Sequence, residues 1–280
     1  MAGSLLVTGG SGYLGGELLR QARGRPLAAT YHSGSPDGPG SVDWTRLDVR
    51  DEDAVAGLVE RVRPEVVIHT AYRQDGEGAR QITVDGAAAV ARAAAGAGAR
   101  LIHLSSDVIF DGAKGSPYDE DDAPTPVTDY GQAKADAEDA VREAHPEALL
   151  VRTSLIYGGP EPSRHERLAI EAARGEGQAF FDDEVRCPVV VGDLASALLE
   201  LAGRDETGIL NVAGADEVSR WEFACLIASA AGLDAGRIRR TSIAESGLSR
   251  PGNCTLTSRR AQGMLDTHLT GARERLGGVA

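Results

Sequence analysis

The sequence predicts an α/β fold: a doubly wound parallel sheet in the first half of the chain and a smaller C-terminal α/β region after it. Short β-rich segments alternate with alanine-rich helical segments through the first half, which is typical of a parallel sheet wrapped by helices. A glycine-rich turn follows the first predicted strand, and the regular alternation ends near Tyr157. These three observations together favour a nucleotide-binding type of sheet.

Six segments have the apolar, β-branched composition of buried strands. They are Ser4–Thr8, Leu27–Tyr31, Trp44–Asp48, Val66–Thr70, Arg100–Ser105 and Leu149–Thr153. Between them, the apolar residues of 14–22 and of 54–62 recur at the spacing of one helix face, and Asp51 stands at the N-cap position of the second helix. Residues 79–98 are almost all small and predict one helix packed closely on the sheet. Later in the chain we expect helices near 165–174, 194–201 and 220–231 and a strand near 209–212.

Composition excludes several classes of protein. The 280 residues carry 29 Lys+Arg and 42 Asp+Glu, a formal net charge of −13, which argues against binding to nucleic acid or to an anionic membrane. Cys187, Cys225 and Cys254 are odd in number and far apart, so we expect neither a disulfide framework nor a metal site. The apolar run at residues 5–7 is too short for a signal peptide or a membrane span, and we expect a cytoplasmic protein.

The turn Thr8-Gly9-Gly10-Ser11-Gly12-Tyr13-Leu14-Gly15 joins the first strand to the first helix. Gly9 permits the tight turn, Gly12 lets the backbone approach a pyrophosphate, and Gly15 lets helix and strand touch. The N–H groups at the helix start, from Tyr13 and Leu14 onward, attract an anion without any lysine. In this position the turn predicts a dinucleotide cofactor on a Rossmann-type doubly wound sheet.

The end of the second strand favours NADP over NAD. A carboxylate there would bond the ribose 2′-hydroxyl and repel a 2′-phosphate, but the chain has Tyr31, His32 and Ser33 instead. The alternative is that Tyr31 and His32 only border the adenine pocket. The sequence does not show whether Arg20 or Arg23 reaches the 2′-phosphate.

Tyr130 and Lys134 stand four residues apart and therefore share one face of a predicted helix. A nearby ammonium favours the phenolate form, which lowers a tyrosine pKa and makes Tyr130 a usable general acid or base. Ser106 follows the fifth predicted strand and would emerge at the carboxyl end of the sheet, where ligands bind in such folds. Its hydroxyl is suited to hydrogen-bond a substrate carbonyl.

These segments together resemble the extended short-chain dehydrogenase/reductases, and among them dTDP-4-dehydrorhamnose reductase and its relatives. The likeness is carried by TGGSGYLG at 8–15, SSDVIFDG at 105–112, YGQAK at 130–134 and the spacing of 24 residues between Ser106 and Tyr130. The resemblance implies that Ser106, Tyr130 and Lys134 are catalytic, that Lys134 also holds the cofactor ribose, and that Asp107 lies near the substrate.

The resemblance also implies further cofactor and substrate contacts. Asp48 and Val49 would border the adenine, and the turn formed by Thr70, Ala71 and Tyr72 would pass the ribose. In the looser C-terminal landmarks, Arg186 and Arg250 are candidates for substrate phosphate contacts, because guanidinium groups suit phosphate, although structural ion pairs are an equal alternative.

The breaker cluster at 158–162 suggests a boundary. We expect a dinucleotide-binding domain over 1–156 and a mainly substrate-binding region over 157–280, with some segments returning to the first domain. The resemblance implies a homodimer. It also implies a departure from the family, because this chain has Thr83 where relatives often have an asparagine that supports the catalytic lysine.

The leading hypothesis is an NAD(P)H-dependent reductase of a ketone on a nucleotide-linked sugar or a related polyol. Two alternatives stay open. One is an epimerase or dehydratase that retains a tightly held NAD⁺. The other is a non-catalytic NADP-binding regulatory subunit, such as that of methionine adenosyltransferase.

Overall fold

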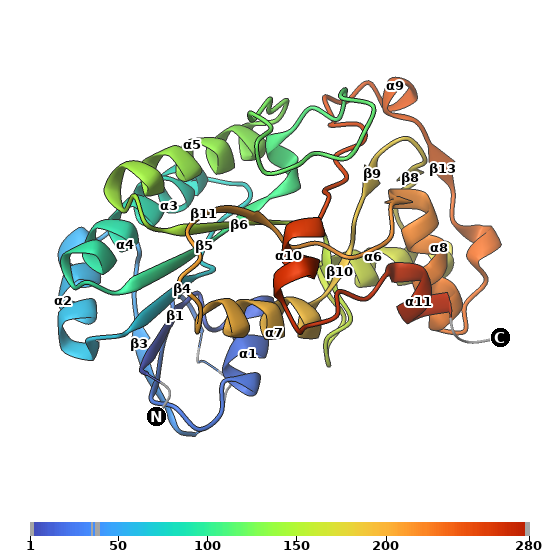
Figure 1. Ribbon diagram of the computed structural model, residues 1–280. Helices are drawn as coiled ribbons and strands as arrows, with labels where there is room; N and C mark the ends of the chain where they lie inside the picture. Colours follow the sequence, from blue (N-terminus) through green and yellow to red (C-terminus); the bar gives the residue numbers. More distant parts are fainter. Residues whose placement is uncertain (1–2, 35, 37–39, 278–280) are drawn as a thin grey trace. The chain divides into compact units, whose positions relative to one another are not determined.

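The computed structural model describes residues 3–34, 36 and 40–277. Its largest sheet has seven strands in the order β11-β6-β5-β4-β1-β2-β3 (Figure 1). The strands are β1 (Leu5–Thr8), β2 (Leu27–Tyr31), β3 (Val42–Arg46), β4 (Val66–His69), β5 (Arg100–Ser106), β6 (Leu149–Thr153) and β11 (Gly208–Asn211). The chain starts in the middle, runs outward to β3 and then returns past β1 to β4, which is the strand order of a doubly wound nucleotide-binding sheet. The predicted fold class is confirmed.

Contacts divide the chain into two compact units. The first consists of Met1–Ser105, Asp129–Val151 and Ala195–Leu210, and the second of Ser106–Thr128, Arg152–Leu194 and Asn211–Ala280. The chain therefore passes between the units several times, whereas the sequence suggested one main boundary after residue 156 with later segments returning.

Helices cover both faces of the sheet in the first unit (Figure 1). They are α1 (Tyr13–Gln21), α2 (Glu52–Val62), α3 (Ala79–Thr83), α4 (Asp85–Gly96), α5 (Asp129–Ala144) and most of α7 (Val191–Leu201). On one face, Leu6, Val67 and Leu101 of the sheet share an aliphatic core with α2, α4 and α5. On the other face, α1 and α7 are joined by a 2.8 Å hydrogen bond from Ser196 Oγ to Gln21 Oε1.

The second unit is built from short elements. Its strands form three two-stranded sheets, β10 (Val189–Val190) with β7 (Ile156–Tyr157), β12 (Val218–Ser219) with β9 (Val185–Arg186), and β13 (Arg240–Thr241) with β8 (Phe180–Phe181). Its helices are α6 (Arg164–Ala173), α8 (Arg220–Ala230), α9 (Ile243–Ser246), α10 (Arg259–Met264) and α11 (Ala272–Gly277), with single 3-10 turns at Asp107–Ile109 and Ala235–Arg237. Tyr157, Phe180 and Phe223 lie in the core that α6 and α8 enclose.

Two predicted elements differ from the structure. The strand expected at Trp44–Asp48 lies two residues earlier, because the Asp48 carboxylate accepts the Arg50 N–H (3.0 Å) and turns the chain out of the sheet. The helix expected over 79–98 is interrupted at Val84, where α3 ends and α4 begins. The expected close packing is present, since a Cβ at Gly86 would lie 2.5 Å from a methyl carbon of Val49.

Within the part of the chain that the structure describes, no helix has both the length and the apolar character needed to cross a membrane.

Candidate active site

The glycine-rich turn has the geometry that a diphosphate requires. Gly9 has a φ of +78°, and a Cβ there would lie 2.8 Å from the backbone nitrogen of Ala71. A Cβ at Gly15 would lie 2.3 Å from the carbonyl oxygen of Gly9, so α1 closely approaches the turn that follows β1. Gly12 is the N-cap of α1, with no side-chain cap and no acid in the first turn of the helix. The first turn of α1 therefore offers N–H groups that the helix does not satisfy, and an anionic diphosphate fits them.

The two residues after Gly12 differ in placement. Tyr13 is 36% exposed, whereas Leu14 is buried in the core. Beside them, Thr70 Oγ1 donates to the carbonyl oxygen of Thr8 (2.8 Å), and Ala71 lies against Gly9. The ends of β1 and β4 are thus tied together, and the structure brings the predicted pyrophosphate and ribose segments side by side.

The end of β2 carries an arginine that the sequence analysis missed. Arg46 pairs with Tyr31 in the parallel register of β2 and β3, and its Nε donates to the carbonyl oxygen of His32 (3.2 Å). His32 and Ser33 are exposed, and Tyr31 packs edge-on against Trp44 with ring centroids 6.3 Å apart. No local pattern marks Arg46, because its place follows from strand pairing.

The two arginines that the sequence analysis considered have other partners. Arg20 forms an ion pair with Glu17 one turn earlier in α1, and Arg23 Nε donates to the carbonyl oxygen of Arg20 (3.3 Å). Of these three arginines, Arg46 is therefore the one whose side chain reaches the residues at the end of β2.

Asp48 and Val49 follow β3. The Arg50 guanidinium binds the Asp48 carboxylate with contacts of 2.6 to 3.1 Å and lowers the pKa of that carboxyl to about 2. The His32 Nε2 atom lies 3.8 Å from Asp48 Oδ2, which places this carboxylate beside the end of β2. Val49 is buried against α4. Asp48 is thus on the surface at this edge of the sheet, and Val49 lies beneath it.

Lys134 is held at the carboxyl edge of the sheet. Its side chain is only 4% exposed, and its Nζ donates to the carbonyl oxygen of Leu104 on β5 (2.8 Å). The same atom lies 4.9 Å from the centre of the Tyr72 ring, and the Tyr72 and Tyr130 rings are 5.9 Å apart. Burial lowers the pKa of Lys134 to about 8, opposed by the negative charge of Glu138. The structure therefore joins Lys134, Tyr130 and Tyr72 in one cluster.

Two buried histidines lie beside this cluster. Thr8, His69 and His103 are neighbours across β1, β4 and β5, with Thr8 Oγ1 2.6 Å from His69 Nδ1 and the two imidazoles stacked 5.3 Å apart. Burial lowers the pKa of His69 to about 3 and that of His103 well below its usual range, and the Lys134 charge acts in the same direction. Both imidazoles are therefore neutral at neutral pH, whereas Lys134 carries a charge.

Ser106 ends β5 and belongs to the second unit together with Asp107. The Ser106 hydroxyl donates to Asp107 Oδ1 (3.2 Å), and Asp107 Oδ2 accepts from Ser154 (2.6 Å). Asp107 is 1% exposed, and burial raises its pKa although Arg186 and both hydroxyl groups act against that shift. Asp107 is thus a fixed partner that orients the Ser106 hydroxyl.

Arg186 has a different position from the one expected of a phosphate contact. It is 1% exposed, its Nη2 lies 3.2 Å from Glu184 Oε1, and its Nη1 donates to the carbonyl oxygens of Val185 and Gly252. Its Nε lies 3.6 Å from Asp107 Oδ2. The buried Arg186 guanidinium thus forms a structural ion pair with Glu184. This is the alternative that the sequence analysis gave to a phosphate contact.

Arg250 also binds the Glu184 carboxylate. Its Nε and Nη2 each donate to Glu184 at 2.9 Å, while 36% of its side chain is exposed. It also lies over the Phe181 ring. Of the two predicted arginines, Arg250 is the one that solvent reaches.

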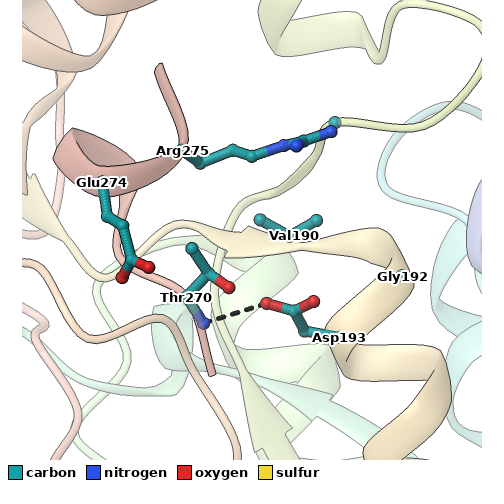
Figure 2. Close-up of a pocket in the computed structure, with 7 residues that line it drawn as sticks. Val190, Gly192, Asp193, Thr270, Glu274 and Arg275 are labelled. Carbon is teal, nitrogen blue, oxygen red and sulfur yellow. Dashed lines mark hydrogen bonds between the residues drawn. The ribbon is translucent and has the colours of Figure 1, made fainter. Parts of the chain in front are cut away.

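The second unit also contains a hollow of about 500 Å³. Figure 2 shows Val190 and Asp193 on one side and the α11 residues Glu274 and Arg275 on the other, with the Thr270 N–H bonded to Asp193 at 2.9 Å. Gly158 and Gly192 complete the lining. The hollow shares no residue with the predicted site.

Comparison with known proteins identifies the family of this chain. The family model described as RmlD substrate binding domain matches residues 3–280. A dTDP-4-dehydrorhamnose reductase of Mycolicibacterium smegmatis is 34% identical over 85% of this chain and 72% of its own length. Methionine adenosyltransferase 2 subunit beta of Rattus norvegicus is 28% identical over 90% of this chain and 79% of its own length.

The fold is also similar to that of a solved dTDP-4-dehydrorhamnose reductase. The crystal structure of a dTDP-4-dehydrorhamnose reductase from Bacillus anthracis in complex with NADP superimposes with a TM-score of 0.82 at 26% identity, covering 99% of this chain and 98% of that one. The resemblance seen in the sequence motifs is thereby confirmed over the whole chain. The chain belongs to the RmlD substrate binding domain family, whose members include dTDP-4-dehydrorhamnose reductases.

Proposed function

We propose that this protein is an NADPH-dependent reductase that acts on a ketone of a nucleotide-linked sugar or a related polyol. The observation that carries the proposal is Lys134, a buried ammonium bonded to Leu104 and placed on the helix face of Tyr130. The relatives named dTDP-4-dehydrorhamnose reductase support the substrate class.

The cofactor fits residues of the first unit. The first turn of α1 after Gly12 would bind the diphosphate, with Gly9 and Gly15 allowing the approach. Arg46, His32 and Ser33 would face a 2′-phosphate, and the NADP of the Bacillus anthracis relative supports NADP over NAD. When bound, the cofactor supplies the hydride.

Each proposed catalytic group has one task. Tyr130 Oη donates a proton to the oxygen of the ketone as that oxygen gains negative charge. The Lys134 ammonium stabilises the phenolate left on Tyr130 and binds the ribose of the cofactor. Ser106 Oγ, oriented by Asp107, hydrogen-bonds the carbonyl oxygen of the substrate.

The proposal also covers substrate binding, cellular location and oligomeric state. Substrate binding is assigned to the second unit, with the exposed edge of Arg250 facing a substrate phosphate. The three cysteines are free thiols, which suits the cytoplasm. The homodimer rests on the family resemblance.

The test measures NADPH oxidation by the purified protein against a panel of 4-keto nucleotide sugars. Tyr130→Phe is expected to bind NADPH as the wild type does and to lose about 10²- to 10⁴-fold in kcat. Tyr157→Phe is the matched control, because it removes a phenol hydroxyl from the core of the second unit. Equal turnover by Tyr130→Phe and wild type would refute the role of Tyr130.

The same assay separates the alternatives. A non-exchanging NAD⁺ in the purified protein, with no net oxidation of NADPH, would favour an epimerase or dehydratase. NADPH binding without turnover of any ketone would favour a regulatory subunit, which the similarity to methionine adenosyltransferase 2 subunit beta keeps as the second candidate.

A further inference from the structure

The Tyr72 ring covers an ammonium group that water barely reaches. Tyr72 is 52% exposed, whereas Lys134 beneath it is 4% exposed. Lys134 Nζ lies 4.9 Å from the centre of the ring, within the range of an attractive cation–π contact. The same atom donates to the carbonyl oxygen of Leu104 at 2.8 Å. The ammonium is thus held by two contacts, one with a ring face and one with a backbone carbonyl.

Thr83 fixes the loop that carries this ring. Its hydroxyl donates to the carbonyl oxygen of Arg73 (3.0 Å) and accepts from the N–H of the same residue (3.3 Å). Thr83 is 1% exposed and stands directly before the interruption between α3 and α4. A threonine therefore ties down Arg73, the residue next to Tyr72.

The other groups around Lys134 define what the ring contributes. Glu138 on α5 adds a negative charge that favours the ammonium form. His69 on β4 and His103 on β5 are neutral, so they add no charge at neutral pH. Burial favours the uncharged amine. The quadrupole of the Tyr72 ring acts against burial, because a ring face attracts a cation and not an amine.

We propose that Tyr72 is a positioning residue for the proposed reduction: its ring holds the Lys134 ammonium beside Tyr130, and Thr83 fixes the loop that carries the ring. The catalytic consequence rests on the proposed function, since it requires Tyr130 to be the proton donor. The contact with Lys134 does not depend on that assumption and is tested separately.

The composition makes a direct test possible, because Lys114 and Lys134 are the only lysines in the chain. Protein labelled with ¹³C at lysine Cε gives two NMR signals, and Lys114→Arg assigns them. Each signal is titrated from pH 6 to pH 11 in wild type, Tyr72→Leu and Tyr72→Phe. Lys114, whose contact with Asp122 raises its pKa, is the internal control in every sample.

The expected result is a lower titration midpoint of Lys134 in Tyr72→Leu, by roughly half to one pH unit, and a midpoint within experimental error of wild type in Tyr72→Phe. Thr83→Val is expected to shift the midpoint in the same direction, and Thr83→Ser to restore it. An unchanged Lys134 midpoint in Tyr72→Leu overturns the proposal. So does weaker NADPH binding by Tyr72→Leu without any shift, because Tyr72 would then be a cofactor contact alone.

The activity measurement distinguishes this inference from the proposed function. The alkaline limb of kcat/KM is expected to move to lower pH in Tyr72→Leu by the same amount as the Lys134 midpoint, whereas a merely structural defect lowers activity equally at every pH. If wild type turns over no ketone but the Lys134 midpoint is shifted in Tyr72→Leu, the proposed reductase function is rejected and the contact between Tyr72 and Lys134 is retained. Wild-type turnover with an unshifted alkaline limb in Tyr72→Leu rejects the positioning role alone.

Discussion

Arg46 lies directly opposite Tyr31 in the parallel pairing of β2 and β3, and its Nε donates to the carbonyl oxygen of His32 at 3.2 Å. This places a guanidinium at the strand end that distinguishes the two nicotinamide cofactors in doubly wound folds. A guanidinium fork suits a phosphate, and the NADPH 2′-phosphate is the group that NADH lacks.

Arg46→Ala is expected to weaken NADPH binding about five- to tenfold, because a charge-assisted hydrogen bond at an exposed site is lost. NADH binding is expected to stay constant. The affinities are measured by fluorescence titration of both cofactors, with Arg23→Ala as the control, since its Nε bonds the end of α1 instead. An equal loss for both cofactors would show that Arg46 does not contact the 2′-phosphate.

Gly15→Ala is expected to lower the free energy of unfolding by about 1–3 kcal/mol and to weaken NADPH binding. The added Cβ would lie 2.3 Å from the Gly9 carbonyl oxygen, so the turn must move. Gly16→Ala in the same helix is the matched control, because a Cβ added there would lie 4.0 Å from the carbonyl oxygen of Gly10. This control is expected to stabilise the protein by about 0.5–1 kcal/mol through helix propensity.

Urea unfolding measures both glycine variants. Trp44 is in the first unit and Trp221 in the second, and the chain has no other tryptophan. A Trp221→Phe background therefore makes the fluorescence report on the unit that contains the turn. Similar stability and NADPH affinity for Gly15→Ala and Gly16→Ala would contradict the close approach at Gly15.

Glu184→Gln is expected to cost about 3–5 kcal/mol of unfolding free energy in the second unit. The buried Glu184 carboxylate binds Arg250 on one side, with Arg186 at 3.2 Å and Arg220 at 4.0 Å. Glu184→Gln removes the negative charge that these two buried guanidinium groups, those of Arg186 and Arg220, share.

For Glu184→Gln, urea unfolding is followed by Trp221 fluorescence in a Trp44→Phe background. Glu274→Gln is the control, because Glu274 and His268 form an exposed contact in the same unit whose removal changes stability by less than about 1 kcal/mol. A comparable small effect for Glu184→Gln would mean that the buried network adds little to stability.

The sequence alone determined the sheet, the glycine turn and the Tyr130-to-Lys134 spacing. Each of these is a local pattern: strand composition, glycines at fixed offsets, and two residues one helical turn apart. The turn at Asp48 was missed, because a side-chain hydrogen bond to the backbone competes with a regular element and leaves no periodic signal. The interruption at Val84 was missed as well.

Only the tertiary structure decided which side chains meet. Arg46 reaches the end of β2 through strand register, Arg186 is buried beside Glu184 through the folding of the second unit, and Tyr72 covers Lys134 because a loop and a helix from distant parts of the chain pack together. Burial and pairing of charged groups depend on these long-range contacts. A sequence pattern specifies the elements, but the partner of each charge is set by how the elements pack.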